Sequence, residues 1–162
     1  MGHELHTARL DLVLLEPVAA RALVAGQSLN GGRWAAGYPL ASSLLRAELT
    51  IAAAAQAHPL GVFGTYQVVR RADDLVIGDV GFIGPPDATG AVSIGCAITE
   101  DERGQGFATE ALAALLEWTR SQSGLTCVLA DTTRSNLASQ RLLERVGMHR
   151  VGEDGELLYY ML

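Results

Sequence analysis

The segment between Ile98 and Ala108 constrains the fold of this 162-residue chain more than any other. An apolar, strand-like run ends at Ile98, and a pattern with helical period begins near Gly106. Arg103 and Gly104 lie between them. The first amide groups of a helix have no partner within the helix, and glycines let an anion approach the backbone closely. The joint between strand and helix therefore indicates a diphosphate site.

Two other interpretations fit a Gly-x-Gly sequence before a helix. It can be only a tight turn. It can also be part of a Rossmann fingerprint, in which Asp131, at the end of the following strand, would bind a ribose. However, Thr109 occupies the third glycine position, and the motif lies two-thirds along a chain with no room for a doubly wound domain.

Composition predicts one globular domain, residues 1–162, because apolar residues make up 49% of the chain and charged residues 19%. The polar N-terminal residues and the lack of a long apolar run indicate neither a signal peptide nor a membrane span, so we expect a cytoplasmic protein. The formal net charge of −6 argues against nucleic acid or an anionic membrane as a partner. The oligomeric state stays open, a homodimer included.

The two cysteines, Cys96 and Cys127, lie in strand-like runs. Their number does not suit a disulfide framework, and their spacing does not suit a metal site. We expect buried free thiols, with Cys96 as a candidate to line a pocket, and no bound metal.

Periodicity predicts a mixed α+β chain. The expected strands are residues 8–15, 62–69, 75–83, 91–98, 125–130, 149–152 and 157–161. The expected helices begin at Pro17, span 40–57, begin near Gly106 and span 136–146. Residues 26–38 read as a loop or broken helix. A helix crosses between the strands around Ile94 and Val128, so these two strands should be parallel.

Four motifs, in order, resemble those of the GNAT N-acetyltransferases, and the last resembles the RimJ/RimL-like branch. They are Gly78-Asp79-Val80-Gly81-Phe82, Ser93-Ile94-Gly95-Cys96, Arg103-x-x-Gly106-x-Ala108, and the segment from Asn136 to Met148. The resemblance implies a mostly antiparallel sheet of about 6–7 strands, flanked by about four helices, with one splayed parallel strand pair. It covers roughly residues 7–162.

The resemblance also implies acetyl-CoA as co-substrate. Ala97 and Ile98 would lie beside its pantetheine, and Asn136 would contact the same arm, although an ordinary helix N-cap is an alternative role for Asn136. Arg103 would add positive charge. The pyrophosphate would face the backbone of Gly104, Gln105, Gly106, Phe107 and Ala108.

Catalytic residues are less well defined. In many relatives a tyrosine donates a proton to the leaving thiolate, and this chain has Leu143 at that position. Ser139 is our main candidate for the proton donor in this chain, and Tyr159 and Tyr160 are weaker candidates. A serine in the first turn of a helix can also simply bond backbone. Asp79 is the candidate base, or else a structural carboxylate. We expect Arg33, Trp34 and Tyr38 to cover the acceptor site, unless Trp34 only covers the core.

The chain offers no obvious general base, which favours an acceptor that loses its proton easily. We therefore expect transfer of an acetyl group to a primary amine, either a protein N-terminal α-amine or a small-molecule amine, by direct attack in a ternary complex. The alternative is a non-catalytic acyl-CoA-binding module or sensor of the same fold.

Overall fold

In a computed structural model, which describes residues 3–162, nine strands form a mixed sheet. The strand order is β1-β2-β4-β5-β6-β7-β9-β8, and β3 pairs with β5 beside this path. Most neighbouring strands are antiparallel, whereas β6 and β7 are parallel, as are β3 and β5. This confirms the predicted fold class and excludes the open parallel sheet of a Rossmann domain.

The elements have the following bounds. The strands are β1 Glu4–His6, β2 Leu10–Leu14, β3 Arg33–Trp34, β4 Thr65–Arg70, β5 Leu75–Phe82, β6 Ala91–Ile98, β7 Cys127–Thr133, β8 His149–Asp154 and β9 Leu157–Met161. The α-helices are α1 Pro17–Val24, α2 Ala41–Ala55, α3 Phe107–Arg120 and α4 Leu137–Arg145. Short 3₁₀ turns are η1 Leu29–Gly31, η2 Gly61–Phe63 and η3 Glu100–Glu102.

The strand count is higher than expected because two strands are very short. β1 has three residues and β3 has two, too few for an alternating pattern to be visible in the sequence. β3 lies inside residues 26–38, which we expected to be irregular. Among residues 3–162, no helix combines the length and the hydropathy that a membrane-spanning segment needs.

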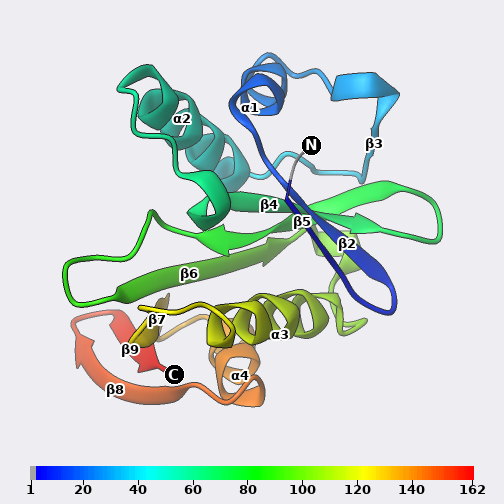
Figure 1. Cartoon of the computed structure of the whole chain (residues 1–162). Helices are drawn as coiled ribbons and strands as arrows, with labels where there is room; N and C mark the ends of the chain where they lie inside the picture. Colours follow the sequence, from blue (N-terminus) through cyan, green and yellow to red (C-terminus); the bar gives the residue numbers. More distant parts are fainter. Residues whose placement is uncertain (1–2) are drawn as a thin grey trace.

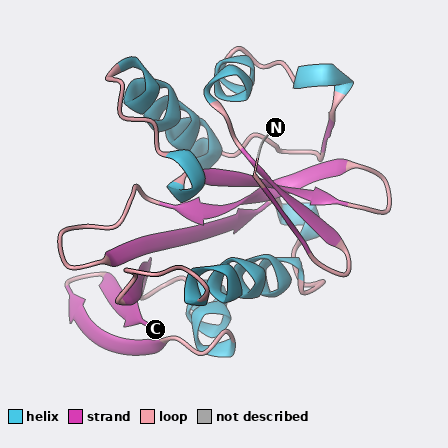
Figure 2. Cartoon of the chain, in the orientation of Figure 1, coloured by secondary structure: helices cyan, strands magenta, loops and turns pink. Residues whose placement is uncertain are grey.

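Helices cover both faces of the sheet. Figure 1 shows α1 and α2 above it and α3 and α4 below it, and Figure 2 shows the same layers by secondary structure. Helix α3 buries one stripe of residues, Leu112, Leu115 and Leu116 among them, against the sheet. This main core fixes the N-terminus of α3 next to the end of β6.

The parallel pair β6 and β7 separates part-way along its length. The strands pair from Ala91 with Cys127 to Ser93 with Leu129. Beyond that point, Ile94 to Ile98 pair only with β5, and β7 pairs only with β9. A gap therefore opens between the two strands on the side where β6 leads into α3.

Candidate functional site

The free edge of β6 presents backbone groups to this gap. Ser93 accepts a hydrogen bond from Ile83 at 2.8 Å, and Thr99 donates one to Ile77 at 2.9 Å, so odd-numbered residues of β6 face β5. Because strand residues alternate, the N–H and C=O groups of Cys96 and Ile98 point into the gap, where the carbonyl of Ile98 accepts from Nε of Arg103 at 2.9 Å and the other three groups remain free for a ligand. An extended chain with amide groups can lie there and continue the sheet.

The turn after β6 has a run of unpaired amides. Arg103 donates its backbone N–H to Glu100 at 3.2 Å, and the next such bond runs from Glu110 to Gly106 at 3.0 Å. Within the described residues, no protein acceptor is recorded for the N–H groups of residues 104–109 between them. Gly104 and Gly106 have φ angles of 75° and 82°, which other residues rarely adopt.

A groove of about 550 Å³ runs along this turn and into the gap. Arg103 from the turn, with Arg141 and Arg145 from α4, lines it. Free amides at a helix N-terminus combined with arginines form an anion site. The residues present therefore fit the diphosphate of a coenzyme A molecule, with its longer arm along the free edge of β6.

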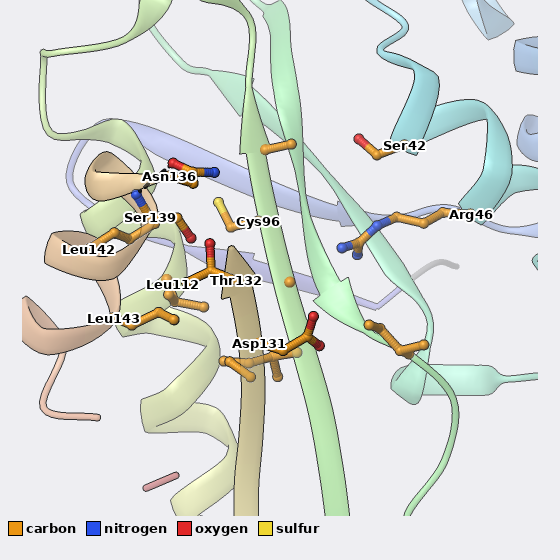
Figure 3. Close-up of a pocket in the computed structure, with 15 residues that line it drawn as sticks. Ser42, Arg46, Cys96, Leu112, Asp131, Thr132, Asn136, Ser139, Leu142 and Leu143 are labelled. Atoms are coloured by element: carbon orange, nitrogen blue, oxygen red, sulfur yellow. Dashed lines mark hydrogen bonds between the residues drawn. The ribbon is translucent and has the colours of Figure 1, made fainter. Parts of the chain in front are cut away.

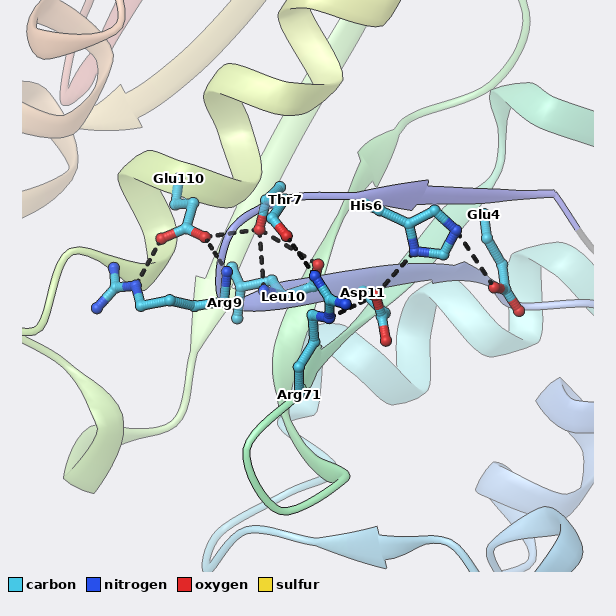
Figure 4. Close-up of polar contacts among 8 residues, drawn as sticks. All are labelled: Glu4, His6, Thr7, Arg9, Leu10, Asp11, Arg71 and Glu110. Carbon is cyan, nitrogen blue, oxygen red and sulfur yellow. Dashed lines mark hydrogen bonds and ion pairs between the residues drawn. The ribbon is translucent and has the colours of Figure 1, made fainter.

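The turn is fastened to the N-terminal hairpin by Arg9 (Figure 4). Its guanidinium donates to Glu110 at 2.7 Å and to the carbonyl of Gln105 at 3.0 Å, and it stacks over Phe107 at 4.4 Å. Glu110 also accepts from the hydroxyl of Thr7 at 2.6 Å. Burial raises the pKa of Glu110, but the hydrogen bonds from Thr7 and Arg9 outweigh it and hold the pKa below its usual range. The conformation of the turn is thus fixed from outside the groove.

A second cavity, of about 250 Å³, adjoins the groove and extends through the gap between β6 and β7, because residues of α2, α3 and α4 all line it. Figure 3 shows Ser42 and Arg46 entering it from α2, and Asp131 lying on β7. The residues common to both spaces are Cys96, Ala97, Asn136, Ser139 and Leu142. A donor in the groove and an acceptor in the cavity would therefore meet at these residues.

Asn136 and Ser139 stand together at this junction. The side-chain oxygen of Asn136 accepts the backbone N–H of Ser139 at 3.1 Å and caps α4. Asn136 thus has the N-cap role that we considered, while its side-chain NH₂ is not used in the cap.

A sequence-family comparison matches residues 9–149 to the acetyltransferase (GNAT) domain. The chain belongs to the GNAT family. YjdG, an uncharacterized N-acetyltransferase of Bacillus subtilis (strain 168), is 30% identical over 100 residues, 60% of this chain and 60% of its own length. The match therefore spans less than two-thirds of that relative.

Solved structures agree with this family. A protein described as a GNAT-family acetyltransferase from Bordetella pertussis is 26% identical with a TM-score of 0.68, covering 98% of both chains. RimL, a ribosomal α-N-protein acetyltransferase, in complex with coenzyme A, is 15% identical with a TM-score of 0.71, covering 99% of this chain and 97% of its own. At that identity, the likeness to RimL shows the fold.

Other predicted residues of this GNAT domain lie outside both spaces. Asp79 is 1% exposed and accepts hydrogen bonds from Tyr38, at 2.8 Å, and from Ser43. Burial raises its pKa, against the hydrogen bonds from these two hydroxyls, which lower it. It lines neither the groove nor the cavity.

The residues expected to cover the acceptor site pack elsewhere. Trp34 and Tyr38 stack edge to face at 5.7 Å within a second core cluster, and Arg33 reaches the backbone of Asp73 at 3.5 Å. None of the three lines either space. The reason is that β3 pairs with β5, and Trp34 and Tyr38 pack in the cluster between α1, α2 and the sheet.

Of the remaining candidates, the two tyrosines of β9 lie outside both spaces and Cys96 lines both. Alternation along β9 buries Tyr160, 1% exposed, and leaves Tyr159 37% exposed, and neither lines the groove or the cavity. Cys96 lines both, and burial raises the pKa of its thiol to about 12. Its thiol is therefore protonated at neutral pH and is not a nucleophile there.

Sequence reasoning missed Arg46, and it considered Asp131 only for a ribose. A signal for Arg46 existed, because it shares a helical face with the buried Ser43, Ala47 and Thr50, where a charge is unusual. For Asp131, only the three-dimensional arrangement brings the residue to the cavity.

Proposed function

We propose that this protein is an N-acetyltransferase that transfers an acetyl group from acetyl-CoA to a primary amine in a ternary complex. The observation that carries this is the meeting of two spaces between β6 and β7, one with unpaired amides and arginines and the other open to an acceptor. Acetyl-CoA supplies the thioester that the amine attacks. The protein's residues bind and orient the two substrates and stabilise the charge that develops during transfer.

In this proposal the unpaired backbone N–H groups from Gly104 to Ala108 bind the pyrophosphate together with the terminal nitrogens of Arg103, whose Nε donates to the carbonyl of Ile98. Asn136 donates its free NH₂ to the pantetheine arm, which lies along Ala97 and Ile98. Ala97 contributes its side chain, since its own backbone faces β5. The N–H of Ile98 points into the gap and can stabilise the charge that develops on the thioester oxygen.

Ser139 is the proposed proton donor to the departing thiolate. It lies at the junction of the groove and the cavity, and its hydroxyl is not committed to the α4 cap. Asp79 has a positioning role rather than a catalytic one, because its oxygens are occupied by Tyr38 and Ser43 and it does not reach the cavity.

The acceptor is proposed to be the α-amine of a protein N-terminus or a small-molecule amine of low pKa. An α-amino group has a pKa near 8 and a lysine near 10.4, so freeing the amine at pH 7 costs about 1.4 and about 4.6 kcal/mol respectively. A site without a dedicated base favours the first. RimL, by its name an α-N-protein acetyltransferase, supports the same class.

Two peptides test this proposal, one with a free α-amine and no lysine, the other N-terminally blocked with one lysine. With acetyl-CoA, kcat/KM measured by CoA release at pH 7 should be higher for the α-amine, on the order of 100-fold. Equal or faster turnover of the lysine peptide would contradict the α-amine assignment.

A non-catalytic acyl-CoA-binding module is the second candidate, favoured by the buried Leu143 where many relatives have the tyrosine. Such a module would bind acetyl-CoA without releasing CoA to any amine.

A further inference from the structure

Arg46 has an unusual environment for a charged side chain. It extends from α2 toward the cavity (Figure 3), and its Nη1 atom is buried with no hydrogen-bond partner among the described residues. A buried donor without an acceptor is costly, and more so when the group is charged. No side-chain hydrogen bond or ion pair joins the guanidinium to another described residue, so its donors other than Nη1 remain available to water or to an anion in the cavity that Arg46 lines.

The strand beneath Arg46 is shaped to admit it. A Cβ atom on Gly95 would lie 2.2 Å from Nη2 of Arg46, so any other residue at this position would displace the guanidinium. Gly95 lies in β6, next to Cys96 at the junction of the groove and the cavity. The glycine therefore holds open the path by which the guanidinium reaches the cavity.

Asp79 does not neutralise the positive charge of Arg46 in an ion pair. The positive charge lies near enough to lower the pKa of Asp79, but it is the weakest influence, after burial, Ser43 and Tyr38. Both carboxylate oxygens already accept from those hydroxyls, and no ion pair joins Asp79 to Arg46 in the described chain. The guanidinium thus keeps a donor for another anion.

Asp131 lies across the gap. Ser93 with Leu129 is the last parallel pair, and Gly95 and Asp131 lie two residues beyond it, on the same face of their strands and on opposite sides of the gap. Among the residues lining the cavity, Arg46 is the one cation and Asp131 the one carboxylate. The two walls therefore carry opposite charges.

We infer that the acceptor carries a carboxylate close to its amine, with the carboxylate bound by Arg46 and the ammonium drawn to the wall of Asp131. This inference rests on the proposed acetyl transfer and specifies its substrate class. A cavity of about 250 Å³ accommodates a small group. The carboxylate comes from a free amino acid or from an acidic residue at the second position of a peptide.

Matched acceptor pairs test this. One pair is alanine and alaninamide; the other is a peptide beginning Ala-Asp and the same peptide beginning Ala-Asn. In CoA release with acetyl-CoA, the acidic member of at least one pair should have a kcat/KM at least about tenfold higher, as for a hydrogen bond to a charged group. The amine of alaninamide is less basic than that of alanine, so more of it is unprotonated at pH 7. Amine reactivity alone would therefore favour alaninamide, and a preference for alanine would have to come from its carboxylate. The pair that shows it identifies the source of the carboxylate.

Variants of Arg46 test whether this residue causes the preference for acidic acceptors. Arg46→Gln should reduce the preference to about twofold or less while the Kd for acetyl-CoA stays within about twofold, and Arg46→Lys should retain part of the preference. Arg21→Gln is the matched control, since Arg21 is exposed on the neighbouring helix α1 and lines neither space. It should keep the full preference.

The outcomes separate this inference from the proposed function. Turnover of amines with no preference for the acidic members would overturn the inference and leave acetyl transfer standing, whether or not Arg46→Gln folds. An equal loss of kcat for all acceptors in Arg46→Gln would also overturn it, because Arg46 would then act on the reaction rather than on the acceptor. Binding of acetyl-CoA with no turnover of any amine would overturn both.

Discussion

The side-chain oxygen of Asn136 accepts the backbone N–H of Ser139 at 3.1 Å, where the groove meets the cavity. Because the cap uses the backbone of Ser139 and not its hydroxyl, the structural role of this pair and its proposed chemical role reside in different atoms. Substitutions can therefore separate them.

Ser139→Ala should lower kcat by about 100-fold, the lower end for loss of a general acid, with little change in the Kd for acetyl-CoA. The helix cap should survive, since alanine retains the N–H that Asn136 binds. Steady-state CoA release and a thermal melt check both parts. An unchanged kcat would remove Ser139 from the mechanism.

The capping role and the proposed binding role of Asn136 can be separated in the same way. Asn136→Asp keeps an oxygen to cap α4 and suits the helix dipole, so the Tm should be retained, but it loses the NH₂ donor and should weaken acetyl-CoA binding about tenfold. Asn136→Ala should lose the cap as well, at about 1 kcal/mol of stability. Calorimetric titration with melting curves tests this; an unaltered Kd in Asn136→Asp would show that the residue is only a cap.

Gly106→Val should weaken CoA binding by at least about 100-fold, the loss of two amide–phosphate hydrogen bonds, because φ at this position is 82°. Gly124→Val is a matched control, since Gly124 has a φ of 88° on a loop away from the groove. Both variants should lose about 1–3 kcal/mol of stability. If both bind CoA like the wild type, the turn has been assigned wrongly.

Asp79 should make stability depend on pH. Its pKa is raised by burial, so the folded protein retains this proton more strongly than the unfolded chain. The contribution is complete below the unfolded pKa, near 3.9, and decreases as the pH rises through the folded pKa. Compared with Asp79→Asn, which cannot ionise, the wild type should lose Tm between pH 4 and pH 7. A constant difference in Tm across this range would contradict the raised pKa.

Much of the fold followed from local patterns. The apolar face of α3, the glycine turn before it and the parallel pairing of β6 with β7 were all visible in periodicity and spacing. β1 and β3 were not, because strands of two or three residues are defined by their pairing partners and not by their own sequence.

The acceptor side of the site could not be read from the sequence in the same way. Trp34 and Tyr38 are aromatic and lie in a glycine-rich segment, which suggested a cover, but long-range pairing of β3 turns them into a core cluster. Arg46, Gly95 and Asp131 come from three separate elements, and only the packing of α2 over the sheet brings them to one cavity. The predicted donor residues lie mostly in one segment, from Ala97 to Ala108, whereas the lining of the cavity depends on tertiary contacts.

The most direct test of the account is CoA release from acetyl-CoA by the wild-type protein, with and without an α-amine acceptor, followed by mass analysis of the acceptor. We predict CoA release that depends on the amine and matches the amount of acetylated product. Tight binding of acetyl-CoA with no amine-dependent release and no acetylated product, across peptides and small amines, would contradict an acetyltransferase and leave a binding module.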